Sequence, residues 1–182
     1  MQYQFHLHKI MVIWFLLNAG GNLKLHLTPE KPFGHWIKVK SSQQFFTFSV
    51  RACDSVQISI CSLPSRIPVY EITLGANNNT RSGILRYEGD VIAIAAEENT
   101  PAIVDCAESR SFYVSWANGN VVVAIGSSTG RRFLEWTDPN PQQLFLLALA
   151  SLSSSVIEWD YDYKTGFSYI YHIYVSYVYH II

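Results

Sequence analysis

The sequence predicts an all-β chain folded as a single antiparallel β-sandwich domain, and three observations lead to this fold class. Apolar and polar residues alternate in Phe46–Ala52 (FTFSVRA), which is the pattern of a strand with one buried face. Similar runs recur between Trp36 and Trp159 at intervals of about 8–12 residues, the spacing typical of sandwiches. No segment keeps a 3.6-residue apolar period over three turns, so long helices are not expected.

Nine runs in chain order have the composition or the alternation of strands. They are Phe46–Ala52, Val56–Ile60, Val69–Leu74, Gly83–Tyr87, Val91–Ala95, Phe112–Ala117, Asn120–Ile125, Phe133–Trp136 and Leu144–Leu149. Segments rich in Gly, Asn, Ser and Pro separate them, as expected of turns. The last run continues into Leu144–Leu152 (LFLLALASL), whose composition suits a short helix as well as a buried strand.

The sharpest local signal is the pair Asn118–Gly119 between two strand-like runs. A two-residue Asn-Gly loop fits a type I′ turn, because both central positions of that turn need a positive φ. The sequence therefore predicts a tight hairpin here.

The composition fits one compact domain with a real core. The chain has 182 residues, of which 49% are hydrophobic, 14% aromatic and only 15% charged. The net charge is −1, so a basic surface for nucleic acid is not expected. The apolar run Ile10–Leu17 is too short to span a bilayer, so no membrane span is expected either.

The chain divides into four segments by composition. A weakly basic start, the apolar run and a small-residue exit at Asn18–Gly21 are the layout of a secretory signal peptide, which predicts a secreted protein. A buried N-terminal strand or short helix is the alternative for this segment. The segments are 1–21 (signal peptide), 22–44 (N-terminal lead or edge strand), 45–159 (the sandwich domain) and 160–182 (an aromatic tail). The tail is either a final strand or a segment that does not belong to the domain.

Three cysteines allow three disulfide pairings or none. We favour Cys53–Cys106, because Cys53 and Cys61 lie on one candidate strand path and would pair only across a tight bend. In a reducing compartment all three would be buried thiols. The triplet Asn78-Asn79-Thr80 lies in a predicted turn and is an acceptor for N-glycosylation at Asn78.

Motifs for catalysis or metal binding do not emerge from the sequence. The six histidines and three cysteines lack metal-ligand spacing, so no metal is expected. No glycine-rich nucleotide loop follows a strand, and no Gly-x-Ser-x-Gly elbow occurs. The sequence therefore identifies no catalytic residue.

Several blocks together resemble the farnesoic acid O-methyltransferase domain family, which also occurs as a module in arthropod and other invertebrate proteins. The blocks are Phe48–Asp54 (FSVRACD), Asn79–Ser82 (NTRS), Phe112–Gly119 (FYVSWANG) and Phe133–Pro141 (FLEWTDPNP). The resemblance covers about residues 45–159, and it leads us to expect a sandwich of the jelly-roll or lectin-like type. The closing strand departs from the family, because its glycine- and tryptophan-rich ending is reduced to SSSVIEW at residues 153–159.

The resemblance implies two different functions. The family name implies transfer of a methyl group from S-adenosylmethionine to farnesoic acid, giving methyl farnesoate. That reaction needs a site that positions a carboxylate against a sulfonium methyl group, and the sequence has no recognisable cofactor motif. The domain also occurs beside lectin-like repeats, which implies an extracellular recognition module for a glycan or a protein. We expect the second function, non-catalytic and without a cofactor; S-adenosylmethionine is the cofactor if the first holds. A purely structural domain cut from a larger protein is the third alternative.

Five residues in the two late blocks are the candidate binding residues: Trp116, Asn118, Trp136, Asp138 and Asn140. The tryptophans alternate with core positions, so packing is their first explanation. Turn geometry accounts for Asn118, and Asp138 can accept a hydrogen bond from the backbone that follows it. In the functional interpretation, these loops and Gly75–Thr80 present polar groups and an aromatic face, as sugar binding needs.

Overall fold

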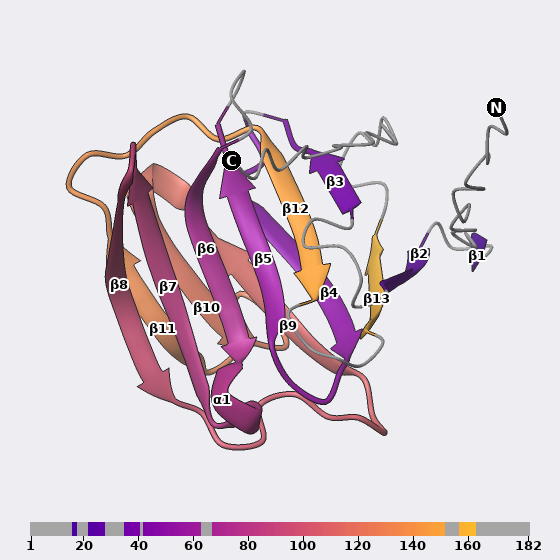
Figure 1. Cartoon of the computed structure of the whole chain (residues 1–182). Helices are drawn as coiled ribbons and strands as arrows, with labels where there is room; N and C mark the ends of the chain where they lie inside the picture. Colours follow the sequence, from indigo (N-terminus) through magenta and orange to yellow (C-terminus); the bar gives the residue numbers. More distant parts are fainter. Residues whose placement is uncertain are drawn as a thin grey trace, which may run out of the picture.

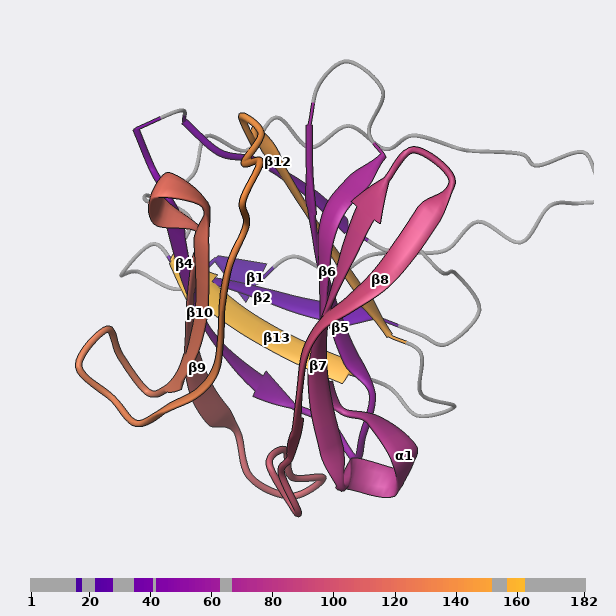
Figure 2. The same ribbon diagram turned by 90° about the vertical axis from the view of Figure 1, so that its left-hand side faces the viewer.

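The computed structural model describes residues 16–17, 22–27, 35–40, 42–62, 67–151 and 157–162. These residues form two antiparallel sheets that face each other, which confirms the predicted β-sandwich (Figure 1). Figure 2 shows the two layers from the side, with β9 and β10 in one and β6 to β8 in the other. No helix in the described part of the chain is long and apolar enough to cross a membrane.

The first sheet has seven strands. Their order is β1 (Leu16–Leu17), β2 (Asn22–Leu27), β13 (Ile157–Asp162), β4 (Phe45–Arg51), β9 (Arg110–Ser115), β10 (Asn120–Ile125) and β11 (Arg132–Thr137). The second sheet has six strands. Their order is β3 (His35–Lys38), β12 (Leu146–Ser151), β5 (Val56–Cys61), β6 (Pro68–Gly75), β7 (Arg81–Glu88) and β8 (Val91–Asn99).

Each of the nine strand-like runs lies on a strand, as predicted. The ambiguous segment after Leu144 is a strand rather than a helix, because β12 pairs with β3 on one side and β5 on the other. Strand β8 is longer than the run Val91–Ala95 and continues to Asn99, which pairs with Arg81. The end of β8 contains Glu97 and Glu98 and has no alternation of apolar and polar residues, so the sequence does not predict this part of the strand.

The core lies between the sheets and is filled by alternate residues of each strand. Phe46, Phe48 and Val50 of β4 point inward and are buried. Aromatic rings fill the middle of the seven-stranded sheet: Phe48 lies 5.2 Å from Trp159 and 5.7 Å from Phe112, measured between ring centroids. This burial of large rings is the main stabilising term of such a core.

Strands at both ends of the chain join the sandwich outside residues 45–159. Strands β2 and β3 come from the predicted N-terminal lead, and β3 is the edge strand of the six-stranded sheet. Strand β13 ends at Asp162, so the first three residues of the predicted tail belong to the seven-stranded sheet. Residues 1–15 and 18–21 of the predicted signal peptide, and 163–182 of the tail, lie outside the described residues.

Candidate functional site

The hairpin between β9 and β10 has the predicted turn. Asn118 has φ 54° and ψ 32°, Gly119 has φ 78°, and the Asn120 N–H donates to the Ala117 carbonyl. These are the angles of a type I′ turn, which Asn and Gly accommodate best. The turn leaves Asn118 exposed and buries Gly119.

The loop that follows β11 packs directly on this turn. The Asp138 N–H donates to the Gly119 carbonyl at 2.9 Å. A Cβ atom placed on Gly119 would lie 2.7 Å from the Cβ of Pro141. Glycine is therefore required at this position by the positive φ and by the close approach of the loop.

A buried ion pair holds the same loop to the opposite sheet. The Arg86 Nε of β7 donates to Asp138 Oδ2 at 2.7 Å, and the Tyr70 hydroxyl of β6 donates to the same oxygen at 2.6 Å. The Asn140 N–H donates to Asp138 Oδ1 at 2.8 Å. The side chains of Arg86 and Asp138 are 8% and 3% exposed. Arg86 also donates to the carbonyls of Tyr87 and Asn140, so its guanidinium is well satisfied.

The Asp138 carboxylate of this network keeps its charge at neutral pH. Burial on its own raises the pKa of Asp138, but hydrogen bonds from Tyr70 and the Asn140 N–H, together with the Arg86 charge, lower it overall. Burial, helped by the hydrogen bond to Asp138, raises the pKa of Tyr70. Asp138 is therefore ionised and Tyr70 neutral, which is the pairing that their hydrogen bond needs.

The turn, the loop and the residue before β4 line an open pocket of about 410 Å³. Its lining residues are Gln44, Trp116, Asn118, Gly119, Pro141, Gln142, Gln143, Leu144 and Phe145. Four of these side chains are amides, each of which can both donate and accept hydrogen bonds. None of the described lining residues is charged, so the pocket suits a neutral polar ligand.

The structure separates the five candidate binding residues into two groups. Trp116 and Asn118 line the pocket, although the indole of Trp116 is almost fully buried. Asp138 lies inside the molecule with both carboxylate oxygens engaged, so it positions the loop. Trp136 and Tyr70 form a T-shaped aromatic pair with ring centroids 6.0 Å apart. Asn140 is exposed and is not among the residues that line the pocket.

Sequence reasoning missed the glutamines and Arg86. Gln44 and the pair Gln142–Gln143 line the pocket from segments about a hundred residues apart, and no local pattern joins such segments. Arg86 left a visible signal: it follows Ser82 and Ile84 in the inward register of β7, where a charged side chain needs a buried partner.

The lining of the pocket gives little to the positively charged sulfonium group of S-adenosylmethionine. A charged group moved out of water is stabilised best by a partner of opposite sign. The described lining residues supply amides, an indole and apolar side chains, but no carboxylate. We derive no methyl-transfer step from this site.

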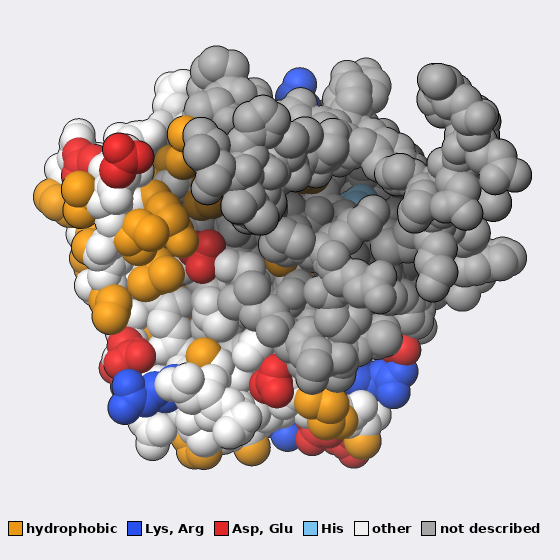
Figure 3. Space-filling view, viewed as in Figure 1, with side chains coloured by type: hydrophobic (Ala, Val, Ile, Leu, Met, Phe, Trp, Pro, Cys, Tyr) orange, Lys and Arg blue, Asp and Glu red, His pale blue; other side chains and the backbone are white. Residues whose placement is uncertain are grey.

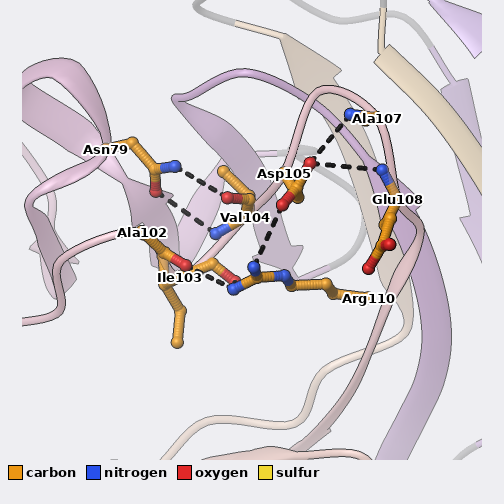
Figure 4. Close-up of polar contacts among 8 residues, drawn as sticks. All are labelled: Asn79, Ala102, Ile103, Val104, Asp105, Ala107, Glu108 and Arg110. Atoms are coloured by element: carbon orange, nitrogen blue, oxygen red, sulfur yellow. Dashed lines mark hydrogen bonds and ion pairs between the residues drawn. The ribbon is translucent and has the colours of Figure 1, made fainter.

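The turn α1 (Ala76–Asn79) lies at the other end of the sandwich, so it does not share a surface with the pocket (Figure 2). Asn77, Asn78 and Asn79 all have left-handed φ angles of 52–60°. The Asn79 amide donates to the Val104 carbonyl at 2.7 Å and accepts from the Val104 N–H at 3.2 Å (Figure 4). Asn79 thus anchors the turn. Asn78, the first residue of the predicted N-glycosylation triplet, is exposed.

The loop that Asn79 contacts is held by Asp105. Its Oδ1 accepts hydrogen bonds from the N–H groups of Ala107 and Glu108, and its Oδ2 accepts from Arg110 at 3.1 Å (Figure 4). The two N–H groups, followed by Arg110, lower the pKa of Asp105.

The same loop carries the disulfide. Cys53 and Cys106 are bonded, with their Cα atoms 4.3 Å apart. Cys61 is a free, buried thiol, and burial raises its pKa to about 12, with a smaller contribution from Glu71. Among the described residues, no group of three or more His, Cys, Asp or Glu side chains is placed to hold a metal ion.

The sequence profile of the family described as farnesoic acid O-methyl transferase matches residues 28–165. A search of curated protein sequences finds no match to this chain.

Among solved structures, galectins share the fold. Sheep galectin-11 has a TM-score of 0.53 at 9% identity, covering 71% of this chain and 99% of the galectin. Caenorhabditis elegans galectin LEC-6 has a TM-score of 0.51 at 10% identity, covering 75% and 94%. A toad ovary galectin, solved with N-acetylgalactose, has a TM-score of 0.50 at 9% identity, covering 70% and 99%. At such identities the similarity shows the fold alone.

Proposed function

This chain belongs to the farnesoic acid O-methyltransferase family, and we propose that it is a non-catalytic, lectin-like recognition module that binds a neutral glycan. The binding site is the pocket at the hairpin end of the sandwich, with Asn118, Gln44, Gln142 and Gln143 as its polar contacts.

The observation that carries this function is the chemistry of the pocket lining. Sugar hydroxyls both donate and accept hydrogen bonds, and so do amide side chains. A sugar ring also has apolar C–H faces, and Phe145 is the partly exposed ring of the lining that can meet them, because Trp116 and Leu144 are almost fully buried beneath the pocket. Because the described lining residues carry no charge, the pocket favours a neutral sugar over a ligand with a phosphate, a carboxylate or a sulfonium group. The likeness of the fold to galectins, one of them solved with N-acetylgalactose, supports the same ligand class.

We further propose that the chain is exported and carries a glycan of its own on Asn78. A disulfide such as Cys53–Cys106 persists in oxidising compartments, and Asn78 is an exposed member of an acceptor triplet. Treatment of secreted material with an N-glycosidase is expected to lower the apparent mass, and an Asn78→Gln variant should not change on treatment. Secreted wild-type material of unchanged mass would contradict glycosylation.

Binding is tested with a glycan array and one pair of matched variants. Asn118→Gly keeps the left-handed turn and removes the amide from the pocket, so it should weaken the array signal about tenfold. Asn77→Gly makes the same change in the left-handed turn at the other end of the sandwich and should leave the signal unchanged.

Three results would count against this function. Equal loss of signal in both variants, or no array signal for the wild type, would contradict the pocket as a glycan site. Micromolar binding of S-adenosylmethionine in a calorimetric titration would favour the methyltransferase. Binding of a protein partner that depends on Asn118 would make the pocket a protein-recognition site.

A further inference from the structure

The outer face of the seven-stranded sheet carries a stacked aromatic pair beside the pocket. Phe45 directly follows Gln44, which lines the pocket, and its ring stacks on Tyr113 with centroids 5.9 Å apart and planes at 22°. Phe45 is 40% exposed and Tyr113 is half-buried. The exposed part of this aromatic pair is an apolar surface next to Gln44, which lines the pocket.

Hydroxyl groups continue the same face along β4 and β9. Thr47 pairs with Tyr113 and Ser49 pairs with Ser111, so these side chains share the outer face with the rings. The Ser49 and Ser111 hydroxyls lie 2.8 Å apart. The aromatic pair Phe45–Tyr113 is therefore followed on the same face by hydroxyl groups.

A second hollow lies over these hydroxyls. Its volume is about 240 Å³, and Thr47, Ser49 and Ser111 are among the residues that line it. Asp160 of β13, which pairs with Ser49, brings a half-buried carboxylate to the same hollow. From Phe45 to Ser49 the strand advances about 13 Å, given a rise of about 3.3 Å per residue.

This sequence of groups matches the chemistry of a sugar chain. Ring C–H faces pack on aromatic rings, and sugar hydroxyls pair with hydroxyl and carboxylate oxygens. The outer face of the six-stranded sheet differs at its β8 edge, where the aliphatic side chains of Ile92 and Ile94 are exposed (Figure 3). Those side chains offer neither a ring face nor a hydrogen-bonding group.

We propose that the chain binds an extended neutral oligosaccharide along β4 and β9, which deepens the proposed glycan binding and rests on it. One sugar unit occupies the pocket, the next lies on the Phe45–Tyr113 pair, and a further unit reaches the hollow at Asp160.

The test measures how affinity depends on oligosaccharide length. The probes are linear galactose, glucose and fructose oligomers of one to six units, titrated calorimetrically into the whole chain. For the series that binds, affinity should rise about tenfold or more between one and four units, and then level off. Phe45→Leu removes a ring and keeps the apolar bulk, so it should abolish most of this rise without changing the affinity for one unit.

Two further variants complete the test. Asp160→Asn should reduce only the last part of the rise, because its carboxylate lies at the far end of the surface. Ile92→Ala, on the exposed edge of the other sheet, should leave the whole length dependence unchanged. Thermal unfolding of each variant shows that it is folded.

The outcomes separate this inference from the proposed function. A single unit that binds as tightly as a long chain, or a length dependence that survives Phe45→Leu and Asp160→Asn, would overturn the extended site and leave the pocket intact. If no oligomer of any length binds, the proposed glycan binding fails, and the extended site fails with it.

Discussion

The two ends of the sandwich are held together by different chemistry. At the hairpin end, the buried Arg86–Asp138 pair joins a loop of one sheet to the interior face of the other. At the end that carries α1, the Cys53–Cys106 disulfide and the bonds of Asn79 and Asp105 tie loops to each other. The Arg86–Asp138 pair holds the loop that lines the pocket, but neither residue lines the pocket itself. The described lining therefore stays uncharged although a charged pair stabilises it.

The largest effect is expected when the buried pair is broken. Asp138→Ala leaves the Arg86 guanidinium and the Tyr70 hydroxyl buried without their acceptor, and should lower the free energy of unfolding by about 3–5 kcal/mol. Glu135→Ala removes an exposed carboxylate on neighbouring β11 and is the control, with a far smaller loss. Urea denaturation measures both, and equal losses would show that the buried pair does not hold the hairpin end.

A somewhat smaller effect is expected at the other end when the disulfide is removed. The double variant Cys53→Ser, Cys106→Ser should lose about 2–4 kcal/mol, because the open chain gains conformational freedom when unfolded. Hydrogen exchange should quicken around Cys53 and in the loop near Asp105, while the amides around Asn118 keep their protection. Loss of protection at both ends would contradict their independence.

Glycine substitutions separate backbone strain from contact with the loop. Gly119→Ala forces a left-handed alanine against Pro141, and should cost about 1–2 kcal/mol for the angle and about 1–3 kcal/mol for the contact. Gly126→Ala has a similar φ of 81° at the opposite end of β10, with nothing within 4 Å of its added Cβ. Gly126→Ala should therefore lose only the stability that the left-handed angle costs. Thermal denaturation compares the two, and equal losses would mean that the loop yields to the new methyl group.

The smallest effect is expected from acid. The folded state lowers the pKa of Asp138 below its unfolded value of about 3.9, so its contribution is complete above that pH and is lost as the pH falls below it. Between pH 5 and pH 3 the wild type should lose more stability than Asp138→Asn, which cannot ionise. Urea midpoints across this range measure the difference. Parallel curves for the two proteins would show that Asp138 is not the group responsible.

The strands and the hairpin were predictable because their signals are local. Period-two alternation marks β4, and the Asn118–Gly119 pair sets its own turn geometry. The site depends on sheet order, which alternation does not encode. The sequence presents Asp138 as a polar loop residue, and only the pairing of β6 with β7 brings Tyr70 and Arg86 to it.

The residues of the pocket could likewise be predicted only where a local sequence pattern marks them. Trp116 and Asn118 were found because they flank a turn signal, whereas Gln44 and Gln142 come from loops that carry no pattern of their own. They meet because β4 pairs with β9 and because the chain crosses from β11 to β12 at this end. The aromatic pair Phe45–Tyr113 was missed for the same reason, since it joins two strands.

Side-chain amide resonances report directly whether the amide-lined pocket binds a neutral glycan. A ¹⁵N-labelled chain is titrated with the strongest neutral glycan from the array, and separately with S-adenosylmethionine. The side-chain amide signals of Gln44, Asn118, Gln142 and Gln143 should shift with the glycan and stay in place with S-adenosylmethionine. Glycan-induced shifts that leave these four residues unchanged, or shifts of these residues with S-adenosylmethionine, would show that the pocket is not a site for a neutral glycan.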